Sequence, residues 1–288
     1  MLHGIVLALL LLLPALSHAG SAIDVPYGSD PKQRLDVYHP DQCLQQRCPV
    51  VVWVHGGGWR HGDKQHRGAK DLADTWTAAG AVVVNLNYRL TPEVMHPAHV
   101  QDVAAGIAWI HRNIGRYGGD PQRTFLLGHS AGAHLVALVA TDPQYLAAHG
   151  LGLRQALAGV MPIDTASFDL VANNGPPVGR MIEDAFGTDP AVLRAASPLL
   201  IVKAGSRDYP PFVIAAVKSR RLAVQQSNAL ARLLPEASVI VEDYDARSKL
   251  RAHGDIARDL ADAQSHLAQE LMKFTGLRAP AAGRAADD

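Results

Sequence analysis

The sequence predicts one α/β domain whose central sheet is mostly parallel and has helices on both faces. Short, continuous apolar segments recur along the 288 residues, as is typical of strands buried on both faces. Segments with apolar residues at helical spacing separate them, and this alternation is typical of parallel sheets. The length fits one large domain better than two small ones, and the sequence contains no internal repeat and no domain linker.

The expected elements follow one another from a pair of opening strands to a closing helix. Strands are expected at residues 23–27, 34–39, 50–54, 81–86, 123–127, 158–163, 212–217 and 238–242. Helices are expected at residues 70–79, 99–116, 131–140, 221–234 and 253–274. Residues 165–210 lose this periodicity and are expected to form a cap-like loop over the substrate pocket. Ligands in such sheets bind outside the C-terminal ends of the strands.

Both ends of the chain differ from the domain between them. Residues 1–19 are predicted to be a secretory signal peptide, because their apolar run is too short to span a bilayer and Ser17 and Ala19 suit a signal peptidase. No Lys or Arg precedes the run, so a retained N-terminal anchor is the alternative. The domain at 20–277 is expected to be secreted or periplasmic, with no stable membrane span after processing. Residues 278–288 are expected to form a flexible tail.

Charge and cysteine content narrow the classes of partner. The 27 basic and 27 acidic side chains balance, which argues against nucleic acid or an anionic membrane as partner. In an exported protein, Cys43 and Cys48 most simply form a disulfide. Their C-x4-C spacing also occurs in metal sites, but no histidine or second cysteine pair is near enough in sequence to complete one. Neither a metal nor a cofactor is expected.

The pentapeptide G-x-S-x-G at residues 128–132 organises the candidate chemistry. It follows one predicted strand and opens a predicted helix, which is the context of a nucleophile elbow. In such an elbow, strained backbone lifts the hydroxyl of Ser130 above the sheet edge. Gly128 and Gly132 are expected to remove side chains that would collide where strand and helix crowd together.

A second motif, His-Gly-Gly-Gly at residues 55–58, follows the third predicted strand. Ester hydrolysis passes through a tetrahedral oxyanion, which N–H donors must stabilise. Consecutive glycines let the backbone turn its amides inward, so the expected donors are the N–H groups of Gly57, Gly58 and Ala131. A phosphate-binding loop is disfavoured, because neither G-x-x-x-x-G-K-[ST] nor G-x-G-x-x-G is present.

These motifs resemble the α/β-hydrolase superfamily, and most closely the HGGG-type esterases near hormone-sensitive lipase and bacterial feruloyl or acetyl-xylan esterases. The resemblance spans roughly residues 22–275 and implies a serine carboxylesterase that forms an acyl-enzyme. By position, Ser130 matches the nucleophile, and Gly57 and Gly58 match the oxyanion loop. The matching segments are residues 55–64, 87–89, 96–97, 117–121 and 128–132.

The base that activates Ser130 must come from one of 14 histidines. In this fold the base follows the last strand, and the chain order is Ser, acid, His. His253 is the only histidine between the last predicted strand and the closing helix. His266 is expected mid-helix on the surface. His129 and His134 flank the serine in sequence, but an elbow directs neighbouring side chains away from it.

The acid is where the sequence departs from the family pattern. It is expected at about residues 218–221, where Lys-Ser-Arg-Arg contains no carboxylate. Asp164 ends the preceding strand and could reach His253 from there. Alternatively, residues 199–202 form the strand and Asp208 is the acid, or there is no acid at all. Either aspartate could equally be a solvated loop carboxylate.

The combined prediction is an esterase that acts on a small-molecule or glycan ester. The same site also serves peptidases and thioesterases. The alternative from another class is a non-catalytic or weakly active binding protein with this fold, which the segment from Lys218 to Arg221 keeps open. Specificity is not readable from the sequence, because residues 165–210 have no pattern.

Overall fold

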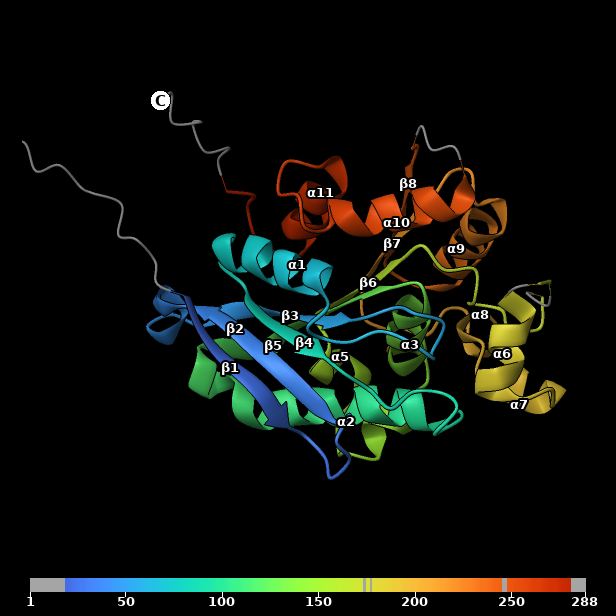
Figure 1. Cartoon of the computed structure of the whole chain (residues 1–288), viewed down its shortest axis with the longest axis horizontal. Helices are drawn as coiled ribbons and strands as arrows, with labels where there is room; N and C mark the ends of the chain where they lie inside the picture. Colours follow the sequence, from blue (N-terminus) through green and yellow to red (C-terminus); the bar gives the residue numbers. More distant parts are fainter. Residues whose placement is uncertain (1–18, 173–174, 177, 245–247, 281–288) are drawn as a thin grey trace, which may run out of the picture.

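Eight strands form a single sheet in the computed structural model, which describes residues 19–172, 175–176, 178–244 and 248–280 (Figure 1). The spatial order is β1-β2-β4-β3-β5-β6-β7-β8. The pairings β1–β2 and β2–β4 are antiparallel and all others are parallel, which confirms the mostly parallel sheet. The strands are β1 (Ala19–Pro26), β2 (Arg34–Pro40), β3 (Cys48–Val54), β4 (Val82–Leu86), β5 (Gly119–His129), β6 (Gly159–Ile163), β7 (Phe212–Val217) and β8 (Ala237–Glu242).

Helices cover both faces of the sheet, as predicted (Figure 1). On one face lie α1 (Arg67–Ala78), α10 (Lys249–Asp259) and α11 (His266–Phe274). The other face is covered by α2 (Ala98–Asn113) and α3 (Ala131–Thr141), and α9 (Arg221–Leu233) packs into the same core. The shorter helices are η1 (Asp41–Leu44), η2 (Ile114–Tyr117), α4 (Pro143–Ala147) and α5 (Leu153–Ala156).

The two cores draw on alternate residues of the same strands. In β3, Val50, Val52 and Val54 face the core of α2 and α3, whereas Val51 and Trp53 face the core of α1, α10 and α11. Successive side chains of a strand point to opposite faces, so a strand covered on both sides must be apolar throughout. This explains why the central strands could be identified as continuous apolar runs.

The segment at residues 165–210 is not the structureless loop that the sequence suggests. It contains α6 (Val178–Phe186), α7 (Pro190–Ala195) and α8 (Pro198–Ile201). A proline begins both α7 and α8, and Asp189 caps α7 by accepting from the N–H of Ala191. Helices this short show no recognisable apolar period, which is why the prediction missed them. The helical conformation of α8 also excludes the alternative strand at 199–202.

The closing helix expected at residues 253–274 is two helices. Ser248 caps α10 and Ser265 caps α11, so each helix has its own start. The apolar spacing continues across the break between them, which explains the error. The first of them, α10, begins at Lys249, before the expected start at His253, so His253 lies within the helix.

The ends of the chain lie largely outside the described residues. The predicted signal peptide at 1–19 is represented only by Ala19, which begins β1, and the predicted tail at 278–288 only by residues 278–280. The predicted disulfide between Cys43 and Cys48 is present. Within the described part of the chain, no helix is long and apolar enough to cross a membrane.

Candidate active site

Ser130 occupies the sharp turn between β5 and α3. Its backbone has φ 57° and ψ −117°, which is a strained conformation for a residue with a side chain. A Cβ on Gly128 would lie 2.5 Å from the carbonyl oxygen of Gly132, and a Cβ on Gly132 would lie 2.1 Å from that of Val54. Both glycines are therefore required by crowding, and the predicted elbow geometry is confirmed.

The glycine loop after β3 borders the same cavity as Ser130. Gly57 has φ 113°, and its carbonyl oxygen accepts from the N–H groups of Arg60 and His61 in a tight turn. A Cβ at Gly57 would lie 2.1 Å from the carbonyl oxygen of His61, so only glycine fits. Among the residues that the structure describes, nothing accepts a hydrogen bond from the amides of Gly57 or Gly58.

Buried side chains hold this loop from behind. The hydroxyl of Tyr88 donates to the carbonyl oxygen of His55 at 3.0 Å, and the two rings stack with centroids 4.5 Å apart. Burial lowers the pKa of His55, so its imidazole is neutral. Asp63 accepts from the Asn87 amide, and Asp102 accepts two hydrogen bonds from the Arg89 guanidinium. Tyr88, Asp63 and Asp102 therefore have structural roles beside the loop.

An aromatic cluster joins the loop to the cap helix α6. Trp59 is 2 % exposed and packs edge-on against His134 and Phe186, with ring centroids 5.4 and 5.0 Å away. Burial lowers the pKa of His134 to about 3, so this ring packs as a neutral group. Trp59 therefore belongs mainly to the core, although its edge borders the cavity.

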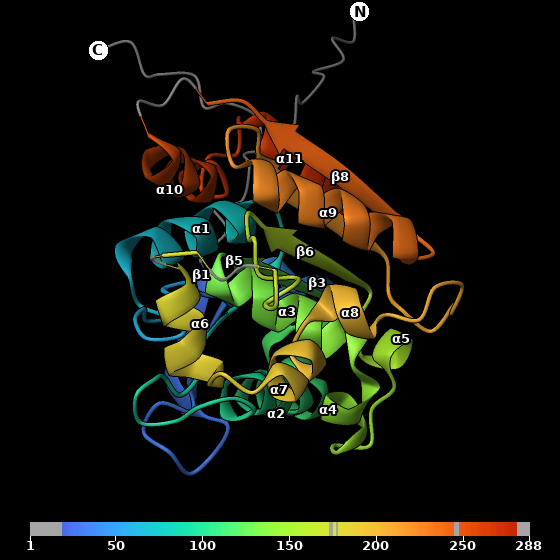
Figure 2. The ribbon, with the colours of Figure 1, turned by 90° about the vertical axis from the view of Figure 1, so that its right-hand side faces the viewer.

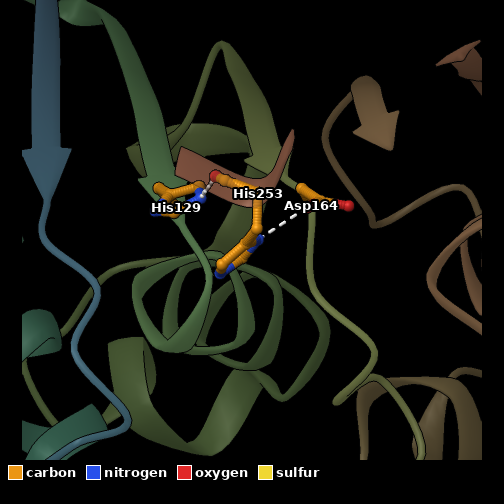
Figure 3. Close-up of side chains that lie close together, drawn as sticks. All are labelled: His129, Asp164 and His253. Carbon is orange, nitrogen blue, oxygen red and sulfur yellow. Dashed lines mark hydrogen bonds and ion pairs between the residues drawn. The ribbon is translucent and has the colours of Figure 1, made fainter. Parts of the chain in front are cut away.

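His253 and Asp164 meet at the edge of the sheet (Figure 3). Asp164 directly follows β6, has φ 50° and is fully buried. Its Oδ2 lies 2.6 Å from Nδ1 of His253, and its Oδ1 accepts from the N–H of Val217 at 3.0 Å. Burial would raise the pKa of Asp164, but the hydrogen bond from His253 and the charge of Arg220 outweigh burial and lower it. The carboxyl group is therefore ionised and held in one orientation.

Arg220 occupies the segment where the family acid was expected. Its Nη1 donates to the carbonyl oxygen of Asp164 at 2.9 Å and also to Oδ2 of the same residue. The same nitrogen lies 2.6 Å from Nδ1 of His253. A guanidinium only donates, so Nδ1 either accepts from Arg220 or donates to Asp164. Arg220 was not among the predicted site residues, because the family pattern calls for a carboxylate in this segment.

His129 is a second residue that the sequence analysis set aside. Its Nε2 lies 2.9 Å from the carbonyl oxygen of His253, and the two imidazoles lie with centroids 4.3 Å apart (Figure 3). Burial, followed by repulsion from His253, lowers the pKa of His129 to about 3. A neutral His129 therefore supports His253 from the elbow side without adding charge.

The nitrogens of His129 and His253 and a carboxylate oxygen of Asp164 lie within 4.8 Å of one another, close enough to share a metal ion. However, His129 already contacts the carbonyl oxygen of His253, and His253 contacts Asp164. The Arg220 guanidinium lies against both ends of the second contact. A fixed positive charge there disfavours a cation, so the three residues fit a hydrogen-bond chain better than a metal site.

Asp208 is far less suited to contact His253. It is exposed, and its carboxylate accepts a hydrogen bond from the hydroxyl of Ser206. It borders a separate surface pocket beside Arg154 and Tyr209, not the cavity that contains Ser130. Of the two candidate aspartates, the structure brings only Asp164 to the histidine.

The cavity has a volume of about 1040 Å³ and gathers the remaining candidates. Ser130, His253, Gly57, Gly58 and Ala131 all line it. The cap helix α6 covers one side, and the Met181 Sδ lies 2.6 Å from the place a Gly58 Cβ would take. The volume suits a small organic ligand.

Comparisons with known proteins find a matching family model and several curated esterases. The BD-FAE family model matches residues 35–234. Esterase LipC of Mycobacterium tuberculosis is 33% identical over 201 residues, which cover 66% of this chain and 49% of LipC. Esterase LipQ of the same organism is 31% identical over 251 residues, which cover 80% of this chain and 56% of LipQ. The chain thus spans about half the length of these curated relatives.

Solved structures share the fold at lower identity. Esterase B from Lactobacillus rhamnosis superposes with a TM-score of 0.70 at 21% identity, covering 90% of this chain and 85% of its own. Thermogutta terrifontis esterase 2 phosphonylated by sarin gives a TM-score of 0.67 at 20% identity, covering 91% and 97%. The architecture is the α/β-hydrolase fold.

Proposed function

We propose, from the premise that this chain belongs to the BD-FAE family, that it is a serine carboxylesterase acting through an acyl-enzyme. The observation that carries the proposal is the contact between the buried Asp164 and His253, a histidine that lines the same cavity as the strained Ser130. A nucleophile, a base and an orienting carboxylate are the parts that acyl transfer needs.

In the proposed reaction, the Ser130 hydroxyl attacks the ester carbonyl carbon while His253 takes its proton. The oxyanion accepts hydrogen bonds from the amides of Gly57, Gly58 and Ala131. His253 then gives the proton to the departing alkoxide, which leaves as the alcohol. Water attacks the acyl-enzyme with His253 as base again, and the carboxylic acid leaves with Ser130 restored.

Asp164 gives His253 the tautomer that these reaction steps require. With Nδ1–H donated to Asp164, the other ring nitrogen is unprotonated and can accept the serine proton. The hydrogen bond from the N–H of Val217 and the contact with Arg220 hold the carboxylate in place. The absence of a carboxylate at residues 218–221 is therefore no reason to prefer a non-catalytic binding protein.

The test is turnover of p-nitrophenyl acetate by the wild type beside Ser130→Ala and His253→Ala. In both variants kcat is expected to fall about 10⁶-fold, because removing either the nucleophile or the base costs about as much as removing the whole triad. His266→Ala is the matched control, since His266 is exposed on α11 and pairs with Glu242. A wild type no faster than Ser130→Ala contradicts the proposal and favours a binding protein.

We also propose that the protein is exported and cleaved after Ala19. The apolar leader and the disulfide between Cys43 and Cys48 support this, because disulfides persist in oxidising compartments. Intact-protein mass spectrometry is expected to give the mass of a chain that begins at Gly20 and has both cysteines oxidised. An uncleaved chain in the membrane fraction would favour the retained anchor.

A further inference from the structure

The cavity continues past Ser130 and His253 into a cleft between α1 and α10. Both helices lie on the same face of the sheet, with α10 alongside α1 (Figures 1 and 2). Small or aliphatic residues line most of the two walls. They are Gly68, Ala69 and Leu72 from α1, and Gly254, Ala257 and Ala261 from α10 and the turn after it. The charged residues that also line the walls, Asp71, Arg258 and Asp262, are exposed.

The spacing along α10 explains how one wall stays open. Positions 254, 257 and 261 recur at helical spacing on one face of the chain. A Cβ added to Gly254 would have its nearest neighbour outside the local backbone, the Arg258 guanidinium, 3.9 Å away, so this face borders open space. From His253 to Ala261 the helical rise gives the cleft a length of about 12 Å.

The cleft has a closed far end and an apolar floor. The hydroxyl of Thr75 donates to the carbonyl oxygen of Ala261 at 2.6 Å, and the Trp76 indole donates to that of Leu260 at 2.9 Å. These hydrogen bonds join α1 to the end of α10. Trp53 from β3 contributes to the floor, and Leu250 stands at the mouth with 79 % of its surface exposed. Such walls favour an apolar occupant, since they release water from apolar surface.

We infer that this cleft binds the alcohol portion of the ester, as an apolar alkyl chain or aromatic ring. The inference rests on the proposed function. His253 must hand its proton to the oxygen of the leaving alcohol, and the cleft begins at Gly254, immediately after that histidine. The other arm of the cavity lies under α6, where Met181 covers the oxyanion loop at Gly58. In this assignment, that arm binds the acyl group.

The test compares two isomeric esters, octyl acetate and ethyl octanoate, which differ only in which side of the ester carries the long chain. Ala257→Phe narrows the cleft and is expected to lower kcat/KM for octyl acetate about tenfold or more. Ethyl octanoate and ethyl acetate are expected to change less than about threefold. Ala147→Phe, at an exposed position on α4, is the matched control. If Ala257→Phe fails to fold, Gly254→Leu fills the same space.

The outcomes separate this inference from the proposed function. If Ala257→Phe lowers kcat/KM equally for octyl acetate and ethyl octanoate, or only for ethyl octanoate, the assignment of the cleft to the alcohol is wrong. The proposed esterase activity is not affected by that result. If the wild type hydrolyses none of the three esters, the proposed function fails and the inference fails with it. Acetate or octanoate release in a pH-stat measures all three reactions directly.

Discussion

The two sides of the candidate catalytic pocket are held in place by different forces. The oxyanion side consists of the glycine loop after β3 and the elbow at Ser130, and backbone geometry fixes it through turns and contacts that only glycine permits. The acid–base side is a set of charged and polar side chains, in which Asp164, Arg220 and His253 arrive from three separate elements. A change of shape should damage the first side, and a change of charge should damage the second.

The two sides also differ in how far apart their residues lie along the chain. The glycine loop and the elbow are each encoded within a few consecutive residues. The acid–base side brings together residues 89 positions apart along the chain, from Asp164 to His253. Strained backbone is shared by both sides, since Ser130 and Asp164 both have positive φ. Such strain persists where the surrounding structure holds it, and it concentrates at functional sites.

The largest effect is expected from Asp164→Asn. The amide keeps the shape and can still accept from the N–H of Val217, but the negative charge is lost. Arg220 is then left beside Nδ1 of His253, and its donation favours the tautomer that cannot act as a base. We expect kcat to fall about 10⁴-fold in p-nitrophenyl acetate turnover.

Asp208→Asn is the matched control for this change, because Asp208 is exposed and borders a different pocket. It should leave kcat within about twofold, as surface substitutions usually do. Retention of a tenth or more of the wild-type kcat by Asp164→Asn would show that Asp164 does not orient the base.

A smaller loss is expected on the other side of the pocket from Gly57→Ala. The added methyl group would lie 2.1 Å from the carbonyl oxygen of His61, so the loop must move and its amides must leave their positions. We expect kcat to fall about 10²–10³-fold, the usual cost of one oxyanion donor, while KM changes little.

Gly150→Ala controls for backbone strain alone. Gly150 also has positive φ, is exposed and has no neighbouring atom within 4 Å of the added Cβ. Its thermal stability should fall as that of Gly57→Ala does, but its kcat should not. If the two alanine variants lose activity equally, strain and not the loss of the donors explains the effect.

The same contrast explains what the sequence could predict. The strands, the elbow at Ser130 and the glycine loop were identified because each depends on adjacent residues and on the buried parallel sheet. Asp164 was one of three open alternatives, since only the fold shows which aspartate reaches His253. The closing helix was expected as one helix because the apolar spacing runs through the break between α10 and α11. Arg220 could have been found only by asking what a basic side chain does in the place of an acid.

The smallest effect on rate, and the most diagnostic one, is expected from Arg220→Gln. Its guanidinium holds both the carbonyl oxygen and the carboxylate of Asp164, the group that orients His253. Without the guanidinium, the carboxylate keeps its hydrogen bond from the N–H of Val217. We therefore expect kcat to fall less than about tenfold in p-nitrophenyl acetate turnover.

Further variants separate the effect of the Arg220 charge from the effect of its geometry. Arg220→Lys retains the charge and should keep kcat near that of the wild type, and Arg221→Gln, at an exposed neighbouring position, should leave kcat unchanged. In Asp164→Asn combined with Arg220→Gln, kcat should fall less than in Asp164→Asn alone, because the guanidinium no longer donates to Nδ1. Coupling of this kind is expected between residues in direct contact. Strictly additive losses would mean that Arg220 only packs against the site, and the acid–base side would then be held by shape, as the oxyanion side is.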